Sequence, residues 1–127
     1  MGTGGAAAAV EWVMQHLNIQ YQFVSRTASA NSIDYKQLTH DTIASHTLII
    51  NTSPVGMYPN VNDAPDIPYE AITAQHHLYD LIYNPNETKF LQLGVQQNAS
   101  TQNGLEMLYI QAEESWKIWN AKTPIVQ

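Results

Sequence analysis

The chain opens on a cluster of glycines that runs directly into alanines, Gly2-Thr3-Gly4-Gly5-Ala6-Ala7. This spacing fits the pattern G-x-G-x-x-G/A, in which the first glycine allows a tight turn and the second lets backbone approach a pyrophosphate. Phosphates bind at such helix N-termini because free N–H groups and the helix dipole favour negative charge there. The cluster therefore predicts a dinucleotide-binding loop. A flexible glycine segment leading into an ordinary helix is the alternative.

A glycine loop of this kind normally follows a buried strand, and here only Met1 precedes it. We therefore expect a domain cut from a longer protein, without its first strand. In the usual strand order that strand is central, so the sheet would contain a slot between the strand expected at 20–24 and the strand expected at 47–50 or its neighbour. Unpaired N–H and C=O groups would face this slot. We expect a partner chain in the slot, a rearranged sheet, or a true start upstream of Met1.

Composition limits the classes of protein to which the chain can belong. Its 127 residues are enough for one domain with one core, and we treat 1–127 as a single domain. The net charge of −6 argues against binding to nucleic acid or to an anionic membrane surface. Cysteine is absent, which excludes disulfides and thiolate metal sites and fits a cytoplasmic location. No metal site is expected.

Strand-like and helix-like segments alternate along the chain. Apolar spacing predicts helices over 6–17, 34–38, 69–74, 88–95 and 105–119, and strands over 20–24, 47–50, 78–83 and 99–101. This alternation predicts an α/β domain of three layers, Rossmann-like, with a parallel sheet truncated at its first strand. Ligands of such sheets bind outside the carboxyl ends of the strands.

The residues after the strand at 20–24 select the cofactor. NAD-binding domains usually place an acidic side chain here for the ribose 2′-hydroxyl, and this chain has Ser25-Arg26-Thr27 instead. The planar cation of Arg26 suits a phosphate dianion, and the two hydroxyl groups can donate to its oxygens. The segment therefore favours NADP over NAD, with a solvated surface arginine as the alternative.

Five segments together carry a resemblance to a known family. Besides the glycine cluster and 25–27, they are Ile50-Asn51-Thr52-Ser53-Pro54-Val55-Gly56-Met57, Tyr79-Asp80-Leu81-Ile82-Tyr83-Asn84-Pro85 with Thr88, and Asn103-Gly104-Leu105-Glu106-Met107-Leu108 with Gln111. In this order they resemble the C-terminal, NADP-binding domain of shikimate dehydrogenase. The resemblance covers residues 2 to about 120, and its last three motifs are the most specific ones.

The resemblance implies reversible hydride transfer between NADPH and 3-dehydroshikimate in aromatic amino-acid biosynthesis. It implies that Gly2, Thr3, Gly4, Gly5 and Ala6 hold the pyrophosphate and that Ser25, Arg26 and Thr27 hold the 2′-phosphate. Thr52, Ser53, Leu81, Gly104 and Met107 would line the nicotinamide side, and Tyr83 and Gln111 would touch shikimate. Ordinary packing is the alternative for the last two residues.

Two departures from the family pattern bear on function. The position three residues after Thr27 often carries a second basic residue, and here it is Ala30. NADP discrimination would then be weaker. The family's catalytic Lys–Asp pair belongs to an N-terminal domain, so we assign no catalytic residue here and expect the chain alone to be inactive. A quinate/shikimate dehydrogenase that uses NAD and a non-catalytic nucleotide-binding module are the alternatives, and a homodimer of the chain could compensate for the missing strand.

Some polar residues suggest chemistry but have simpler interpretations. His76 and His77 are adjacent, and in a strand adjacent side chains point to opposite faces, so they cannot chelate one ion together. We interpret them as surface or partly packed histidines. Asp80 could serve as a base, but an aspartate at this end of a strand is equally suited to accept hydrogen bonds from loop N–H groups.

Overall fold

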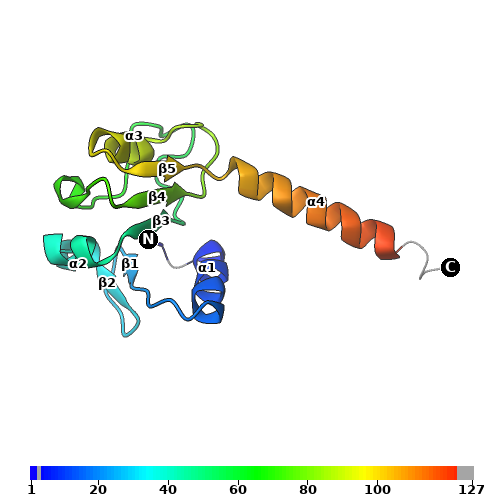
Figure 1. The fold of residues 1–127 in the computed structure, drawn as a ribbon, viewed down its shortest axis with the longest axis horizontal. Coiled ribbons are helices and arrows are strands. Elements are labelled where there is room, and N and C mark those ends of the chain that lie inside the picture. Colours follow the sequence, from blue (N-terminus) through cyan, green and yellow to red (C-terminus); the bar gives the residue numbers. More distant parts are fainter. Residues whose placement is uncertain (3, 123–127) are drawn as a thin grey trace.

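A computed structural model describes residues 1–2 and 4–122, with side chains described as far as residue 118. The α-helices are α1 (Gly5–His16), α2 (His40–Ser45), α3 (Lys89–Gln96) and α4 (Leu105–Lys122), and the short 3-10 helices are η1 (Tyr35–Gln37) and η2 (Tyr69–Ala71). The strands are β1 (Phe23–Ser25), β2 (Ser32–Asp34), β3 (Leu48–Asn51), β4 (His77–Asp80) and β5 (Ser100–Gln102). Strands and helices alternate from β3 onward, as the sequence predicts (Figure 1).

All strand pairs run parallel. One sheet has the order β1-β2 and the other has the order β3-β4-β5. In the larger sheet Ile49 lies opposite Leu78, and Leu78 lies opposite Thr101. Parallel strands of this kind place all their carboxyl ends at one edge. The predicted α/β class with a parallel sheet is confirmed.

Met1 joins the two sheets. Its amine donates to the Ile50 carbonyl at 2.8 Å, and the Thr52 N–H donates to the Met1 carbonyl at 2.9 Å. On the other side the Gly2 N–H donates to the Val24 carbonyl at 2.8 Å. Met1 thus occupies one strand position between β1 and β3, and the interruption that the sequence predicts lies where it was expected (Figure 1).

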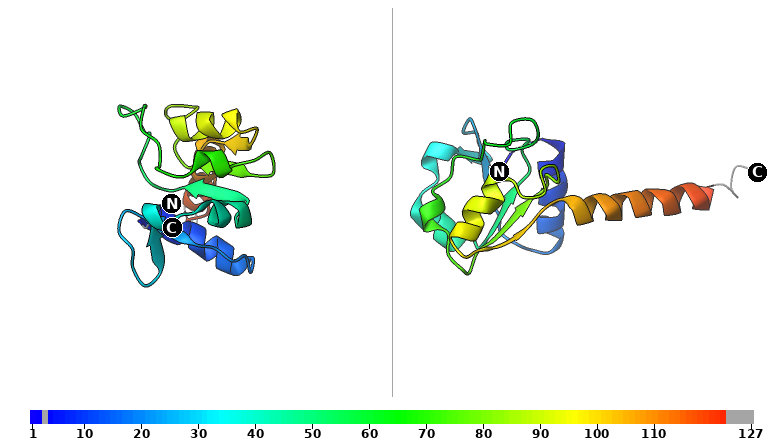
Figure 2. Two further views of the ribbon diagram at one scale, coloured as in Figure 1. Left: turned by 90° about the vertical axis from the view of Figure 1, so that its left-hand side faces the viewer. Right: turned by 90° about the horizontal axis from the view of Figure 1, so that it is seen from above.

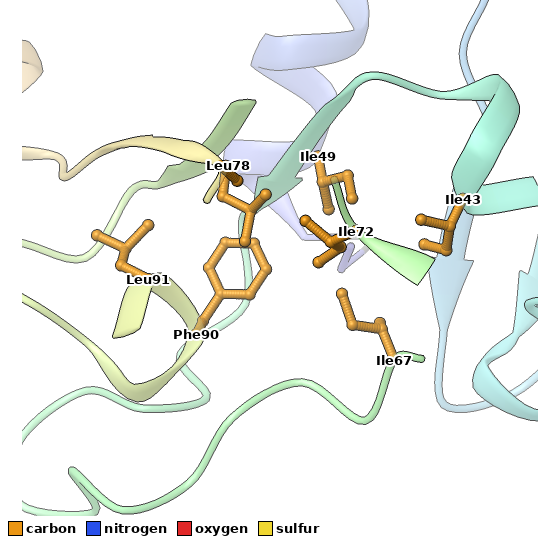
Figure 3. Close-up of a cluster of buried hydrophobic side chains, with 8 residues drawn as sticks. Ile43, Ile49, Ile67, Ile72, Leu78, Phe90 and Leu91 are labelled. Carbon is orange, nitrogen blue, oxygen red and sulfur yellow. The ribbon is translucent and has the colours of Figure 1, made fainter. Parts of the chain in front are cut away.

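The apolar core lies on the side of the larger sheet. Buried side chains from α2, β3, β4 and α3 meet there, and Figure 3 shows Phe90 between Leu91 and the isoleucines. The full cluster comprises Ile43, Ile49, Ile67, Ile72, Leu78, Phe90, Leu91 and Ala99. Phe90 and Leu78 have no exposed surface at all. This cluster fixes the strands whose ends carry the candidate site.

The helix α3 packs directly on β4 and β5. Thr88 caps its N-terminus, because the Thr88 hydroxyl accepts a hydrogen bond from the Leu91 N–H at 3.3 Å, a common way to satisfy a free helical donor. A side chain at Gly94 would place its Cβ 2.6 Å from the Leu78 side chain. The glycine therefore lets α3 approach β4 closely, as small residues do in helix–sheet packing.

Residues 32 to 45 differ from the sequence prediction. The helix predicted over 34–38 is instead the end of strand β2 followed by η1, and α2 was not predicted. Asp34 explains the difference, because its carboxylate accepts from the Gln37 N–H at 2.9 Å while the Gln37 side chain accepts from the Asp34 N–H. This capping box stabilises the single turn of η1 and ends β2 at Asp34.

The helix α4 leaves the body of the domain after Gly104 and extends away from both sheets (Figures 1 and 2). The apolar stripe predicted for 105–119 was expected to be covered by a sheet. In this structure two residues of that stripe, Tyr109 and Trp116, are each more than half exposed instead, and so are Ile110 and Ile118 on the same helix. The side chain of Trp119, also part of the stripe, lies outside the described residues. No helix among the described residues is both long and apolar enough to cross a membrane.

Candidate functional site

Four connecting segments meet at the carboxyl edge of the sheets. They follow Ser25, Asn51, Asp80 and Gln102, the last residues of β1, β3, β4 and β5. Because the strands are parallel, these segments lie at one edge together with the glycine segment, which starts beside Thr52. The structure thus brings to one edge the loops in which the sequence places most candidate residues.

The glycine segment packs against the loop that follows β3. Gly2 has a φ of 101°, and a Cβ there would lie 2.7 Å from the Thr52 Oγ1 and 3.2 Å from the Ser53 N. Only glycine tolerates both this backbone conformation and this approach. The structure therefore joins two of the predicted binding segments. Thr3 lies outside the described residues.

The start of α1 is open and lacks a side-chain cap. Gly4 is the N-cap without a side-chain hydrogen bond, and no acidic residue stands in the first turn. A Cβ built on Gly4 or on Gly5 would meet no other heavy atom within 4 Å. Ala6 is exposed in the same turn. The helix terminus therefore keeps donors and space for an anion, which its dipole attracts.

The loop after β1 presents a cation next to hydroxyl groups. The Ser25 hydroxyl donates to the Thr27 carbonyl at 2.6 Å, which bends the chain around Arg26. Arg26 and Thr27 are exposed, and among the described residues no carboxylate pairs with Arg26. Burial raises the pKa of the nearby Tyr35 phenol, and the positive charge of Arg26 lowers it in part. The guanidinium is thus available for an anionic ligand.

A buried polar network holds the loops after β3 and β4. The Asp80 carboxylate accepts from the Asn51 Nδ2 at 3.2 Å, from the Ile82 N–H at 3.0 Å and from the Thr88 hydroxyl at 2.7 Å. The side chains of Asn51, Asp80 and Thr88 have no exposed surface. Burial raises the pKa of Asp80, and the three hydrogen bonds oppose that shift.

The same network reaches the residues expected to bind the cofactor. The Asn51 Oδ1 accepts from both the N–H and the hydroxyl of Ser53, at 3.1 and 2.6 Å. The role of Asp80 as an acceptor for loop N–H groups matches the simpler sequence interpretation. The role of Asn51 was missed, although a polar residue that ends an apolar strand is a usable signal for such a bond.

The loops after β4 and β5 touch at Gly104. A Cβ there would lie 1.9 Å from the Leu81 carbonyl oxygen, so no side chain fits. The Gly104 N–H donates to the Ile82 carbonyl at 3.1 Å. Leu81 and Gly104, both predicted for the nicotinamide side, are therefore in contact, and Met107 follows them as a half-buried residue on the first turn of α4.

The two residues predicted to touch the substrate, Tyr83 and Gln111, lie on different elements. Tyr83 is 45% exposed in the loop after β4. Gln111 is exposed on α4, about 9 Å along the helix from Leu105 at 1.5 Å per residue. The helix α4, which carries Gln111, runs away from the sheets (Figure 1).

The adjacent histidines His76 and His77 take structural positions, and His76 is buried where a surface or partly packed side chain was expected. His76 is buried; its Nδ1 lies 3.0 Å from the Thr73 N–H, and its Nε2 lies 2.8 Å from the Ile43 carbonyl. These bonds tie the start of β4 to α2. His77 lies 2.7 Å from the Ser100 hydroxyl on the neighbouring strand. Within the described residues no group of three histidine or acidic side chains could hold a metal ion.

Parallel strands, a glycine turn leading into a helix and loops gathered at the carboxyl edge define a Rossmann-like α/β domain. No protein-family model matches the chain. The shikimate dehydrogenase (NADP(+)) of Clostridium beijerinckii is 37% identical over an alignment of 126 residues, which covers 94% of this chain and 46% of that protein. That of Methanococcus maripaludis is 36% identical over 140 residues, covering 99% of this chain and 50% of that protein.

Solved structures of shikimate dehydrogenases also superpose on this chain. The shikimate dehydrogenase of Aquifex aeolicus superposes with a TM-score of 0.80 at 28% identity, covering 94% of this chain and 46% of that one. A shikimate dehydrogenase in complex with NADP+ superposes with a TM-score of 0.61 at 31% identity, covering 90% and 37%. The chain belongs to the shikimate dehydrogenase family, and it spans about half the length of the curated relatives it matches.

Proposed function

We propose that this chain is the NADP-binding domain of a shikimate dehydrogenase that transfers hydride reversibly between NADPH and 3-dehydroshikimate. The observation that carries the proposal is the open start of α1, packed beside Thr52 and Ser53, with Arg26 exposed at the end of β1. Relatives of this chain are named for NADP(+), and one solved relative holds NADP+. The donors present suit a ligand with a pyrophosphate and a further phosphate.

The residues divide into three groups by what they would hold. The segment from Gly2 to Ala6 would hold the pyrophosphate through backbone N–H groups. Ser25, Arg26 and Thr27 would hold the 2′-phosphate through one cation and two hydroxyl groups, with the Ser25 O–H turned from the Thr27 carbonyl toward the phosphate. Thr52, Ser53, Leu81, Gly104 and Met107 would line the nicotinamide, and Tyr83 and Gln111 would contact the substrate. The cofactor supplies the hydride chemistry, and these residues bind and orient it.

The chain alone is proposed to be inactive. The family resemblance assigns the catalytic Lys–Asp pair to a domain that this chain does not match, and positioned acid–base groups contribute about 10²–10⁴-fold to rate. Binding of the cofactor is therefore the property to measure on these 127 residues.

Ala30 favours a second candidate, a related dehydrogenase that uses NAD. A residue without charge stands where a second cation would strengthen the phosphate site. A non-catalytic nucleotide-binding module is less well supported, because it needs neither Tyr83 nor Gln111. Titration with both cofactors separates the first two candidates.

The test compares NADP and NAD binding to the chain, to Arg26→Ala and to the control Lys36→Ala. Arg26→Ala is expected to weaken NADP binding by about 1.5–3 kcal/mol, the loss of a hydrogen bond between charged groups, and to leave NAD binding nearly unchanged. Lys36 is another exposed cation nearby, so its loss controls for general electrostatics. Isothermal titration calorimetry gives the affinities. An equal loss for both cofactors contradicts the role of Arg26.

A further inference from the structure

Serine and threonine residues gather where the chain passes from β1 to β2 (Figure 1). Ser25 ends β1, Ser32 begins β2, and Thr27 and Ser29 lie between them. Ser32 is only 6% exposed, although its side chain is polar. A buried hydroxyl group needs hydrogen-bond partners, and those of Ser32 lead to the proposed phosphate site.

The hydrogen bonds of these hydroxyl groups form one continuous chain. The Oγ atoms of Ser25 and Ser32 are 3.2 Å apart, and those of Ser32 and Ser29 are 2.9 Å apart. At one end the Asn31 N–H donates to the Ser29 Oγ at 3.3 Å. At the other end the Ser25 hydroxyl donates to the Thr27 carbonyl at 2.6 Å. The chain of bonds thus runs from the middle of the loop to the end of β1.

The bond to Thr27 fixes the direction of every other bond in this chain. A carbonyl oxygen can only accept, so the single hydroxyl hydrogen of Ser25 goes to Thr27. The Ser25 Oγ therefore accepts from the Ser32 hydroxyl. Because the Ser32 hydrogen is then used, the Ser32 Oγ accepts from the Ser29 hydroxyl. All three hydroxyl groups donate in the same direction, and Ser25 is the last donor.

This loop has little positive charge to offer a phosphate dianion. Arg26 is the only cationic residue between Ser25 and Ser32, and the uncharged Ala30 stands three residues after Thr27. A neutral hydroxyl group binds phosphate less strongly than a cation does. A site with one cation therefore depends more on the position and the strength of each hydroxyl donor.

We propose that Ser32 is a positioning residue for NADP. It acts through Ser25, whose hydroxyl it holds and strengthens as a donor to the 2′-phosphate, and it thereby contributes to a preference for NADP over NAD. This inference rests on the proposed function, because the loop after β1 must receive the 2′-phosphate. Ser32 does not touch the cofactor, since its side chain is buried and its hydroxyl hydrogen is engaged by Ser25.

Binding of the phosphate changes only the last bond of the chain. The Ser25 O–H turns from the Thr27 carbonyl to a phosphate oxygen by rotation about its Cβ–Oγ bond. Ser32 continues to donate to the Ser25 Oγ, so that oxygen stays in place. A hydroxyl group that accepts a hydrogen bond is also a stronger donor, because chains of hydrogen bonds polarise one another. Loss of the Ser32 hydroxyl therefore weakens a contact that Ser32 itself does not make.

The test is a double-mutant cycle on Ser25 and Ser32 in the 127-residue chain. Isothermal titration calorimetry measures NADP and NAD binding to the parent chain, to Ser25→Ala, to Ser32→Ala and to the double variant. Ser25→Ala should weaken NADP binding about tenfold or more, because it removes the donor. Ser32→Ala should weaken it about threefold to tenfold, because the donor remains but is less well held.

Two results of this cycle separate positioning from a general structural role. In the double variant the loss of NADP affinity should equal that of Ser25→Ala alone, because Ser32 acts through Ser25. NAD has no 2′-phosphate, so its affinity should change less than about twofold in every variant.

Two further variants serve as controls. Ser32→Thr keeps the hydroxyl group in a residue that suits a strand, so NADP binding should stay within about twofold of the parent chain. Ser100→Ala removes another serine that begins a strand and forms two hydrogen bonds, to the His77 ring and to the His76 carbonyl. Ser100 lies at the amino end of β5, away from the carboxyl edge, and NADP binding should be unchanged.

Four results would overturn this inference and leave the proposed function in place. They are unchanged NADP binding in Ser32→Ala, an equal loss for NADP and NAD, additive losses in the double variant, and NADP binding in Ser32→Thr as weak as in Ser32→Ala. A parent chain that does not bind NADP more tightly than NAD would instead contradict the proposed 2′-phosphate site, and this inference with it.

Discussion

The two sides of the sheet differ in how firmly they are held. On the side of β3, β4 and β5, eight buried apolar side chains form one cluster, and Asp80, Asn51 and Thr88 form a fully buried polar network. On the side of β1 and β2, Val24, Ala7 and Ser32 are buried but lie outside that cluster. The difference shows that the loops after β3 and β4 are attached to the better-packed part of the domain, while the loop carrying Arg26 follows a two-stranded sheet with fewer buried side chains.

The comparison is sharpest for a pair of phenylalanines. Phe90→Ala is expected to lower the free energy of unfolding by about 3–5 kcal/mol, because Phe90 is wholly buried in the core cluster. Phe23→Ala should cost about 1 kcal/mol, because Phe23 is half-buried on β1 and lines an open groove between β1 and β3. Urea denaturation followed by circular dichroism measures both. Similar losses would show that the two sides are equally well packed.

A pair of aspartates at strand ends gives the next largest effect. Asp80→Ala should cost about 2–4 kcal/mol, because it leaves the buried Asn51 and Thr88 side chains without their acceptor. Asp34→Ala on β2 removes an exposed cap of η1 and should cost about 1 kcal/mol. Both changes delete a carboxylate that accepts a backbone N–H, so the denaturation midpoints compare burial directly. A larger loss at Asp34 would reverse the comparison.

The smallest of the three effects concerns the seam between the two sides. Burial lowers the pKa of the Met1 amine from 8.0 to about 6 in the folded chain. Between these values the unfolded chain binds more protons, so the free energy of unfolding should rise from pH 6 to pH 8 by up to about 2–3 kcal/mol. An acetylated N-terminus removes this titration and leaves all other groups in place. The same rise after acetylation would contradict the assignment to Met1.

Sequence patterns predicted the better-packed side more accurately. The helix at 88–95 and the strands at 47–50, 78–83 and 99–101 correspond to α3, β3, β4 and β5 with shifted ends. These segments are apolar with clear boundaries, and Thr88 is a strong helix-start signal. Between residues 32 and 45 the structure depends on capping hydrogen bonds of the Asp34 and Thr39 side chains, which the spacing of apolar residues cannot predict.

The candidate site could be predicted as a set of segments but not as a geometry. The glycine motif placed Gly2 beside a turn, whereas its packing against Thr52 and Ser53 depends on residues some fifty positions away. Tyr83 and Gln111 came only from the family resemblance, and their binding role stays a prediction. The direction of α4 was not predictable, since an apolar stripe does not specify what will cover it.

The contact between Gly104 and Leu81 influences the direction in which α4 leaves the domain. Gly104 stands just before an 18-residue helix, which is about 27 Å long at 1.5 Å per residue. Any side chain at 104 must push against the Leu81 carbonyl, because its Cβ would lie 1.9 Å from that oxygen. Over that length a tilt of about 10° at the pivot carries the far end through about 5 Å. The direction in which α4 presents its exposed apolar face thus depends on residue 104 having no side chain.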